Sequence, residues 1–495
     1  MSKIIIQNGN MCELDLPLKF AQKLYNEFAI RHPNAFYLRT RQRGMQNWDG
    51  KIHYITKTGQ FKIGLLPKVY DMCIEMGIKP KVVDMRQPLP KVSKVVTNIG
   101  KYKLRPEQEK AVKAVINNKI GNTPFHIGVL DYTVNAGKTL IMSSLYLSYK
   151  KQLKTLLITN DSDWLNQARE EFKQYLPGED ITFVQGKVLN WSNFTIGMVQ
   201  SISRNMRFYQ KELSQIDMVL VDEADQGGSK QYQNVITRLF NTRIRIGLSG
   251  TIYMSKLAKD KVKNMNLECF FGKVIAEFKL KDSIKKGYST KTIVKMVPGK
   301  PWYGNWESDC ISYKEIYDDS ITENNTAWTM AYNRLRWNIN QGRYPALVVC
   351  KHIAHCENLY KFFKKKLGDA YNIAYVHVNT PSKLRQQIMR DFREGKIDIL
   401  VSTTIIARGK NFPKLKYLLN TASMDSQEKS IQFLGRLVRT YESKNKVYLD
   451  DLHYPGNYLD RHGKHRKQYY QRQELKVILL DKLWKKHPNH SLIKS

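Results

Sequence analysis

The most regular pattern in the chain is an alternation of short apolar runs with longer amphipathic stretches after residue 120. Short apolar runs are typical of buried strands, and the stretches between them are typical of helices. This alternation predicts a parallel sheet with helices on both faces. The runs of this first series are Phe125–Leu130, Leu156–Ile158, Ile181–Val184, Phe194–Val199, Met218–Val221 and Ile244–Leu248.

A second series of the same kind begins near residue 341 and predicts a second α/β lobe. Its runs are Ala346–Cys350, Ile373–Val376, Ile397–Val401, Tyr417–Leu419 and Val447–Leu449. Four tryptophans (Trp302, Trp306, Trp328 and Trp337) lie in or near the less regular segment between the two series. We expect them to pack a joint between lobes rather than to stack on bases.

Residues 1–95 precede both series and predict a small α+β domain. Ile4–Ile6 reads as a strand and Lys19–Phe28 as a helix, and the segment after Pro88 reads as a linker. We therefore expect a domain over 1–95, a first lobe over 96–285, a connector over 286–340 and a second lobe with a basic tail over 341–495. The length of 495 residues is consistent with several domains.

The first block contains a candidate surface for nucleic acid. Arg39, Arg41 and Arg43 occupy alternate positions, which predicts one face of a strand, and Trp48 precedes a predicted Asp49–Gly50 turn. Arginines beside an aromatic ring suit phosphate contact and base stacking. The alternative is a solvated edge strand with a core tryptophan.

A candidate phosphate-binding loop follows the first run of the first lobe. Tyr132–Thr139 ends in Ala136-Gly137-Lys138-Thr139 and leads into a predicted helix. Backbone N–H groups of such a turn favour an anion, and glycine allows its close approach. The lysine can contact the β- and γ-phosphates, and the threonine hydroxyl can ligate Mg²⁺. Tyr132 stands where the common pattern has glycine.

Two further polar groups end strands of the first lobe. Asp222-Glu223-Ala224-Asp225 follows Met218–Val221, and Ser249-Gly250-Thr251 follows Ile244–Leu248. An aspartate after such a strand can reach a Mg²⁺ ion, and a neighbouring glutamate can polarise the attacking water. In parallel sheets, ligands commonly bind at the carboxyl ends of the strands, where these residues are expected to lie.

Other polar side chains lie outside these strands. Gln108 opens a predicted helix, and its amide can donate to and accept from an adenine edge. In the second lobe, Arg436 and Arg439 are three residues apart and so share a helix face. Paired guanidinium groups suit a γ-phosphate during transfer.

The charge balance points to a polyanionic partner. Eighty-one basic residues face 44 acidic ones, which gives a formal net charge of +37, and nucleic acid is the default candidate. The six cysteines form no Cys-x-x-Cys pair, so zinc fingers and a disulfide framework are not expected. Cys350 and Cys356 flank His352 and His355; a metal site and ordinary packing are both open, and packing is favoured. Without a signal-peptide or membrane-spanning pattern, we expect a cytoplasmic protein.

The motif series as a whole resembles the superfamily 2 helicases. Leu104–Gln108 is similar to their Q-type motif, Ala136–Thr139 to motif I, Asp222–Asp225 to motif II and Ser249–Thr251 to motif III. Thr403–Asn411 is similar to motif V and Gln432–Arg439 to motif VI. Within the superfamily, Asn47–Lys51 and Leu65–Pro67 resemble phage helicases of the UvsW type. Asp225 and Asn411 depart from the His and Asp common in those motifs.

The resemblance implies two RecA-like lobes that bind ATP and Mg²⁺ and move on branched or forked DNA. It implies catalytic roles for Lys138, Asp222, Glu223, Arg436 and Arg439, nucleotide contacts by Arg105, Gln108, Ala136, Gly137, Lys138, Thr139 and Gly409, and metal contacts by Thr139 and Asp222. It also implies nucleic-acid contacts near Ser249, Thr251 and Thr403. Two alternatives are an ATP-dependent RNA helicase, which the Asp-Glu-Ala-Asp sequence suggests, and a passive scaffold with a degenerate ATPase.

Overall fold

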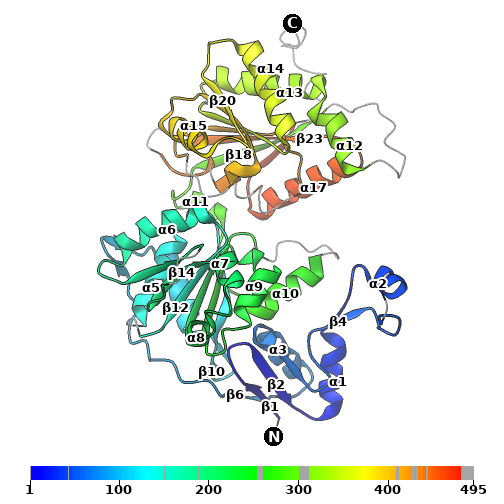
Figure 1. Cartoon of the computed structure of the whole chain (residues 1–495), viewed down its shortest axis with the longest axis vertical. Helices are drawn as coiled ribbons and strands as arrows, with labels where there is room; N and C mark the ends of the chain where they lie inside the picture. Colours follow the sequence, from blue (N-terminus) through cyan, green and yellow to red (C-terminus); the bar gives the residue numbers. More distant parts are fainter. Residues whose placement is uncertain are drawn as a thin grey trace. The chain divides into compact units, whose positions relative to one another are not determined.

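The chain forms two compact units, Met1–Phe278 and Lys279–Ser495. Each contains a seven-stranded sheet (Figure 1). The computed structural model describes residues 2–42, 44–149, 152–186, 190–252, 260–299, 312–407, 412–425, 430, 433–435, 437–441 and 444–480. Within these ranges, no helix combines the length and the apolar character that a membrane span requires.

The large sheet of the first unit confirms the predicted parallel fold, because every neighbouring pair of its strands is parallel. Its strands are buried along most of their length, as expected for a sheet covered on both faces. In sheet order the strands are β13 (Ile181–Val184), β14 (Phe194–Met198), β12 (Thr155–Thr159), β15 (Met218–Asp222), β16 (Ile244–Ser249), β11 (His126–Tyr132) and β17 (Val274–Phe278).

Helices flank this sheet and connect its strands. They are α4 (Pro106–Ile116), α5 (Lys138–Ser148), α6 (Ser162–Tyr175), α7 (Val199–Arg204), α8 (Gln210–Ser214), α9 (Lys230–Ile236) and α10 (Lys261–Phe271). Because β15, β16 and β11 are neighbours, their carboxyl ends meet at one edge of the sheet. This edge therefore carries the predicted motifs I, II and III together.

The N-terminal segment of the first unit forms a second, smaller sheet of four strands. In sheet order they are β5 (Gln60–Lys62), β2 (Met11–Asp15), β1 (Lys3–Ile6) and β6 (Lys81–Asp84), with helices α1 (Leu18–Glu27) and α3 (Leu66–Glu75) beside them. Its buried side chains belong to the same hydrophobic cluster as those of the large sheet. Residues 1–95 therefore share one core with the lobe that follows.

A buried arginine joins the small sheet to the large one. Arg245 lies on β16 and is fully buried, and its guanidinium donates to the Gly9 carbonyl at 2.6 Å and to Asn10 Oδ1 at 2.8 Å. It also donates to the Phe270 carbonyl at 3.2 Å. Since an unsatisfied buried charge is costly, these acceptors hold the loop before β2 against β16.

The basic segment of the first block is a helix rather than the strand that we expected. Residues 29–53, which we call the arm, contain β3 (Ala29–Arg31), α2 (Ala35–Arg41) and β4 (Lys51–His53), and β3 pairs with β4. Arg39 and Arg41 lie on α2, where residues two apart point in different directions; Arg43 is outside the described residues. Asp49–Gly50 precedes β4 and does not form a tight hairpin turn.

The sheet of the second unit is also entirely parallel in its described pairs. In sheet order its strands are β20 (Ile373–Val376), β21 (Ile399–Thr403), β19 (Ala346–Cys350), β22 (Tyr417–Asn420), β23 (Lys446–His453), β18 (Lys291–Pro298) and β24 (Val477–Leu479). The helices include α11 (Leu280–Lys285), α12 (Tyr313–Tyr317), α13 (Asn325–Asn340), α14 (Ile353–Leu367), α15 (Ser382–Glu394) and α17 (Asn457–Arg472).

The expected connector over residues 286–340 is part of this second unit. β18 is an inner strand of its sheet, and the buried face of α13 packs into its core. Trp328 is partly buried against that core, as expected for packing, whereas Trp337 is 43% exposed. Trp302 and Trp306 lie outside the described residues.

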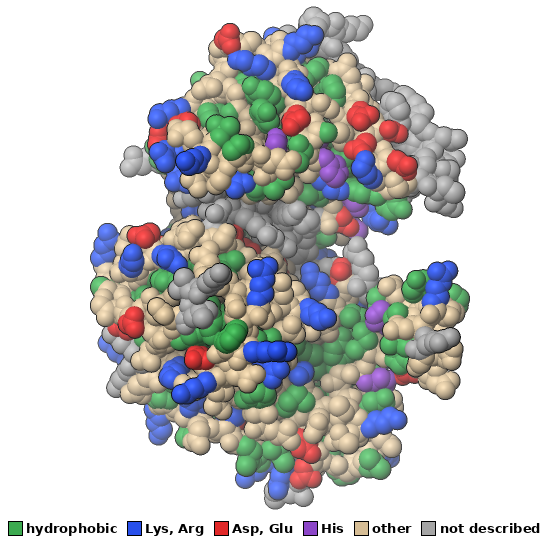
Figure 2. Space-filling view, in the orientation of Figure 1, with side chains coloured by type: hydrophobic (Ala, Val, Ile, Leu, Met, Phe, Trp, Pro, Cys, Tyr) green, Lys and Arg blue, Asp and Glu red, His purple; other side chains and the backbone are tan. Residues whose placement is uncertain are grey.

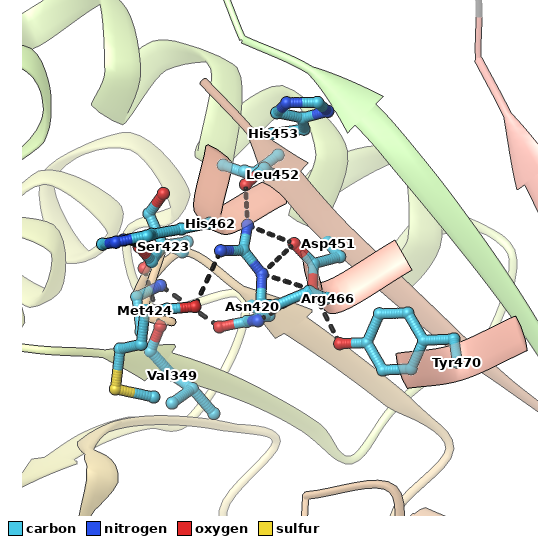
Figure 3. A network of polar contacts seen from close by, with 12 residues as sticks. Val349, Asn420, Ser423, Met424, Asp451, Leu452, His453, His462, Arg466 and Tyr470 are labelled. Carbon is cyan, nitrogen blue, oxygen red and sulfur yellow. Dashed lines mark hydrogen bonds and ion pairs between the residues drawn. The ribbon is translucent and has the colours of Figure 1, made fainter. Parts of the chain in front are cut away.

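A buried ion pair joins α17 to β23, and a hydrogen bond from the same arginine reaches the segment after β22 (Figure 3). Arg466 is fully buried and donates to both carboxylate oxygens of Asp451, with the shortest contact at 2.8 Å. Its Nη1 donates to the Met424 carbonyl at 2.9 Å, and the Tyr470 hydroxyl donates to Asp451 at 2.7 Å. This network holds the backbone of Met424, four residues after the end of β22, against α17.

Candidate nucleotide-binding site

The predicted phosphate loop lies between β11 and α5. Its backbone is left-handed at Asn135 (φ 64°) and at Gly137 (φ 71°), and α5 begins directly at Lys138. Turns of this kind gather backbone N–H groups into a concave site for anions, and the helix dipole adds to the attraction. A β-carbon at position 137 would collide with the side-chain amide of Gln108 unless that amide moved, and the left-handed backbone also favours glycine here.

Gln108 connects the start of α4 to the phosphate loop. It is 1% exposed; its Oε1 accepts from the Arg105 N–H, and its Nε2 donates to the Ala136 carbonyl, both at 2.8 Å. Arg105 is the residue that caps α4. The amide therefore supports the shape of the loop, and the adenine contacts expected for Arg105 and Gln108 stay predictions.

Tyr132 departs from the common loop pattern because it belongs to the strand. It is the last residue of β11 and is fully buried, and its hydroxyl donates to the Glu107 carbonyl at 2.8 Å. The sharp turn begins only after it, so the conformational freedom of glycine is not needed at this position.

Lys138 and Asp222 face each other across the sheet edge. Lys138 Nζ lies 3.9 Å from Asp222 Oδ1, and the side chain of Asp222 is 6% exposed. Burial raises the pKa of Asp222, and the Lys138 charge acts in the opposite direction. A buried carboxylate at the end of a strand thus faces the lysine that the phosphate loop supplies.

The residues present fit a Mg²⁺ ion that arrives with a nucleotide. Among the described residues, Asp222 Oδ1 is buried without a hydrogen-bond partner, and Thr139 lies beside Lys138 in the first turn of α5. No group of three or more His, Cys, Asp or Glu side chains in the described parts could hold a metal alone. Mg²⁺ commonly binds through one or two protein oxygens together with phosphates and water.

Glu223 adopts a strained conformation next to Asp222. Its φ is 53°, which is uncommon for a residue with a side chain and is a feature of functional sites. It is partly exposed, and its Oε2 accepts from Gln226 Nε2 at 3.4 Å. A partly exposed carboxylate next to Asp222, the candidate Mg²⁺ ligand, can orient a water molecule.

Motifs II and III are joined by a buried hydrogen bond. Ser249 Oγ donates to Asp225 Oδ1 at 2.7 Å and lies 3.1 Å from Thr251 Oγ1. Ser249 is 2% exposed, so its hydroxyl is directed toward Asp225. The expected nucleic-acid contacts of Ser249 and Thr251 stay predictions.

One polar group near the site was missed in the sequence. Asp161 follows β12 and is buried, and its charge contributes to the raised pKa of Asp222. Asn160 beside it contacts Gln226, the partner of Glu223. The sequence contained the signal for Asp161, because it also follows an apolar strand, which was the criterion that selected Asp222.

In the second unit, only part of the predicted set is described. Thr403 is buried at the end of β21, and Arg439 is partly buried. Gly409 and Arg436 lie outside the described residues. The roles of all four stay predictions.

The histidines beside Cys350 and Cys356 fit ordinary packing. His355 is buried, and its Nδ1 lies 3.2 Å from the Tyr317 hydroxyl. Burial lowers its pKa to about 3. Both cysteines are buried and free of disulfides, which agrees with the favoured alternative.

Two RecA-like lobes, with a phosphate loop and an acidic strand end on the first, define a class of nucleotide-dependent motors. Family models support this class: residues 101–254 match the type III restriction enzyme res subunit, and residues 331–441 match the helicase conserved C-terminal domain. Together the two matches give the chain the domain pair and the fold of the superfamily 2 helicases.

Individual relatives are distant. The chain is 21% identical to the ATP-dependent DNA helicase uvsW of Enterobacteria phage T4 over 479 residues, 88% of this chain and 90% of the relative. It is 22% identical to IRC3 of Saccharomyces cerevisiae over 70% of this chain, but it spans only about half (51%) of that relative. RNA helicases are among further relatives.

Solved structures agree on the fold. The ATP-dependent type ISP restriction-modification enzyme LlaBIII, solved bound to DNA, matches 83% of this chain and 34% of its own with a TM-score of 0.58 and 15% identity. A likeness at this identity concerns the arrangement of strands and helices only.

Proposed function

We propose that the chain is an ATP-dependent DNA helicase or translocase that unwinds or branch-migrates forked and junction DNA. In this proposal Lys138 and Thr139 hold the ATP phosphates, and Glu223 positions the attacking water. Arg436 and Arg439 act from the second unit as arginine fingers on the transferred phosphate. Thr139 and Asp222 would hold Mg²⁺, which would offset phosphate charge when bound.

The main support for a branched nucleic acid as the substrate comes from the arm of the first unit. On α2, Phe36 is 81% exposed and Tyr37 is 56% exposed. The Arg41 guanidinium lies 5.1 Å from the centre of the Tyr37 ring, and Arg39 is in the same last turn. Exposed rings beside arginines combine base stacking with phosphate attraction.

Trp48 makes contacts within the arm. Its indole N–H donates to the Lys51 carbonyl at 2.8 Å, and the centres of the Trp48 and His32 rings lie 5.7 Å apart in an edge-to-face arrangement. His53 in turn contacts Asp49 at 2.7 Å and stacks on Tyr25. These contacts brace the arm, so we assign base stacking to Phe36 and Tyr37 and bracing to Trp48.

Surface charge favours a polyanion more generally. On the face shown in Figure 2, lysine and arginine side chains clearly outnumber acidic ones, in agreement with the net charge of +37. The relative named as a DNA helicase aligns with most of this chain, which supports DNA. The alternative, an RNA helicase, rests on the Asp222–Asp225 sequence and on the RNA helicases among the relatives.

ATPase stimulation by different nucleic acids tests the proposal. We expect four-way junctions and forks to stimulate turnover more than single-stranded DNA, and RNA least. Turnover should be measured at matched nucleotide concentration and fixed salt, because polyanion binding depends strongly on salt. Stimulation by RNA equal to or above that by junction DNA would instead favour the alternative.

Truncating the two exposed rings should weaken junction preference. The double variant Phe36→Ala/Tyr37→Ala removes rings that contribute about 1–3 kcal/mol for each stacked base, so preference for junctions over linear duplex should fall by roughly tenfold. Competition binding with labelled junctions measures this ratio. Basal ATPase and thermal unfolding should stay unchanged, because both rings are exposed.

Met85→Ala is the matched control, since this side chain is 67% exposed and lies outside the arm. It should leave junction preference intact. If the double variant keeps the wild-type preference, the arm does not recognise branched DNA.

A further inference from the structure

The end of the predicted motif VI and the segment just after the predicted motif V both contact one buried lysine in the second unit. Lys444 is 6% exposed. Its Nζ donates to the Arg439 carbonyl at 2.8 Å and to the Pro413 carbonyl at 3.1 Å. Pro413 closely follows the motif V segment 403–411, and Arg439 is the last residue of motif VI. One ammonium group therefore connects the last residue of motif VI to the backbone two residues beyond motif V.

A threonine forms hydrogen bonds to the same backbone. Thr290, which directly precedes β18 and is 4% exposed, donates its N–H to the Val438 carbonyl at 2.7 Å. Its hydroxyl donates to the Arg439 carbonyl at 3.2 Å. The Arg439 carbonyl thus accepts from two buried side chains; we call this pair, Lys444 and Thr290, the clamp.

The charge of Lys444 is costly at this place. Burial, followed by the nearby Arg439 charge, lowers the pKa of Lys444 to about 7. An apolar residue of similar size would avoid this cost. A buried lysine that donates to two carbonyls restrains the backbone at both, because charged donors form stronger hydrogen bonds than neutral ones.

We propose that Lys444, together with Thr290, is a positioning residue that fixes the backbone of Arg439 so that its guanidinium is preorganised for the transferred phosphate. This inference rests on the proposed role of Arg439. Neither clamp residue touches the nucleotide in this proposal; both act through the arginine. Small displacements of a catalytic group are enough to slow a reaction strongly.

A double-mutant cycle on ATP hydrolysis tests the clamp. Lys444→Met should lower kcat by roughly tenfold to a hundredfold, the range expected for a displaced catalytic group, while KM for ATP stays close to the wild-type value. In an Arg439→Ala background, measured by single turnover, the same substitution should have no further effect, because the group that it positions is gone.

The control is Lys446→Met, which removes an exposed lysine two positions away and should leave kcat unchanged. Thermal unfolding is measured for each variant. If Lys444→Met does not fold, the double-mutant cycle is repeated with Thr290→Val, which removes one hydroxyl and keeps the side-chain shape. We expect Thr290→Val to lower kcat less than Lys444→Met does, and to have no effect in the Arg439→Ala background.

Three results would overturn the inference. A folded Lys444→Met variant with wild-type kcat would show that the clamp is dispensable. An equal fall in kcat with and without Arg439 would show a purely structural role. If Arg439→Ala alone leaves hydrolysis intact, Arg439 is not an arginine finger, and the proposed role of the clamp is rejected with that assignment.

Discussion

Replacing Lys138 with alanine is expected to abolish ATP turnover, lowering kcat by about a hundredfold or more, as for the loss of one preorganised electrostatic group. The lysine begins α5 at the phosphate loop, and its Nζ lies 3.9 Å from Asp222. Removing the ammonium takes away the positive charge that would face the β- and γ-phosphates. Steady-state ATPase with saturating junction DNA measures the effect.

DNA binding without nucleotide should survive in this variant, because the arm and the phosphate loop are different parts of the first unit. Lys119→Ala, at an exposed lysine on the same lobe, is the control and should hydrolyse ATP normally. Turnover near the wild-type rate in Lys138→Ala would remove the basis for the nucleotide site.

Replacing Arg439 with alanine is expected to preserve ATP binding and to reduce hydrolysis by about 10³- to 10⁵-fold, the range for arginine fingers. The physical reason is that the guanidinium stabilises charge that develops only in the transition state. Equilibrium binding of a fluorescent ATP analogue and single-turnover hydrolysis separate the two effects.

Arg393→Ala, at an exposed arginine in the last turn of α15, controls for loss of positive charge from the second unit. A fall in hydrolysis of less than about tenfold, equivalent to roughly 1.4 kcal/mol, would mean that Arg439 does not contact the transferred phosphate.

Local patterns predicted the two sheets because their strands are almost continuous apolar runs. β18 was not predicted, although its buried and more exposed positions largely alternate. The strands that pair with it lie far away in sequence, because β23 begins at Lys446 and β24 at Val477. Pairings across more than 150 residues depend on the packing of the whole domain, which a local pattern does not contain.

The arm shows why a two-residue period can mislead. Arg39 and Arg41 alternate as in a strand, but Ala35 and Leu38 are three apart and are the less exposed positions of α2, as in a helix. At the candidate site, the turn before α5 and the position of Asp222 at the end of a strand were predictable because their spacing is local. The bonds of Gln108 to Ala136 and of Ser249 to Asp225 were not, because they join distant segments.

The anchoring of Arg245 has a mechanical consequence. Because its guanidinium holds the loop at Gly9 and Asn10 while its backbone belongs to β16, the small sheet and the strand that ends at Ser249 form one stiff body. Ser249 also carries the motif II–III hydrogen bond to Asp225. In the proposed DNA helicase, force on the small sheet would therefore be passed through β16 to the residues proposed to surround the nucleotide.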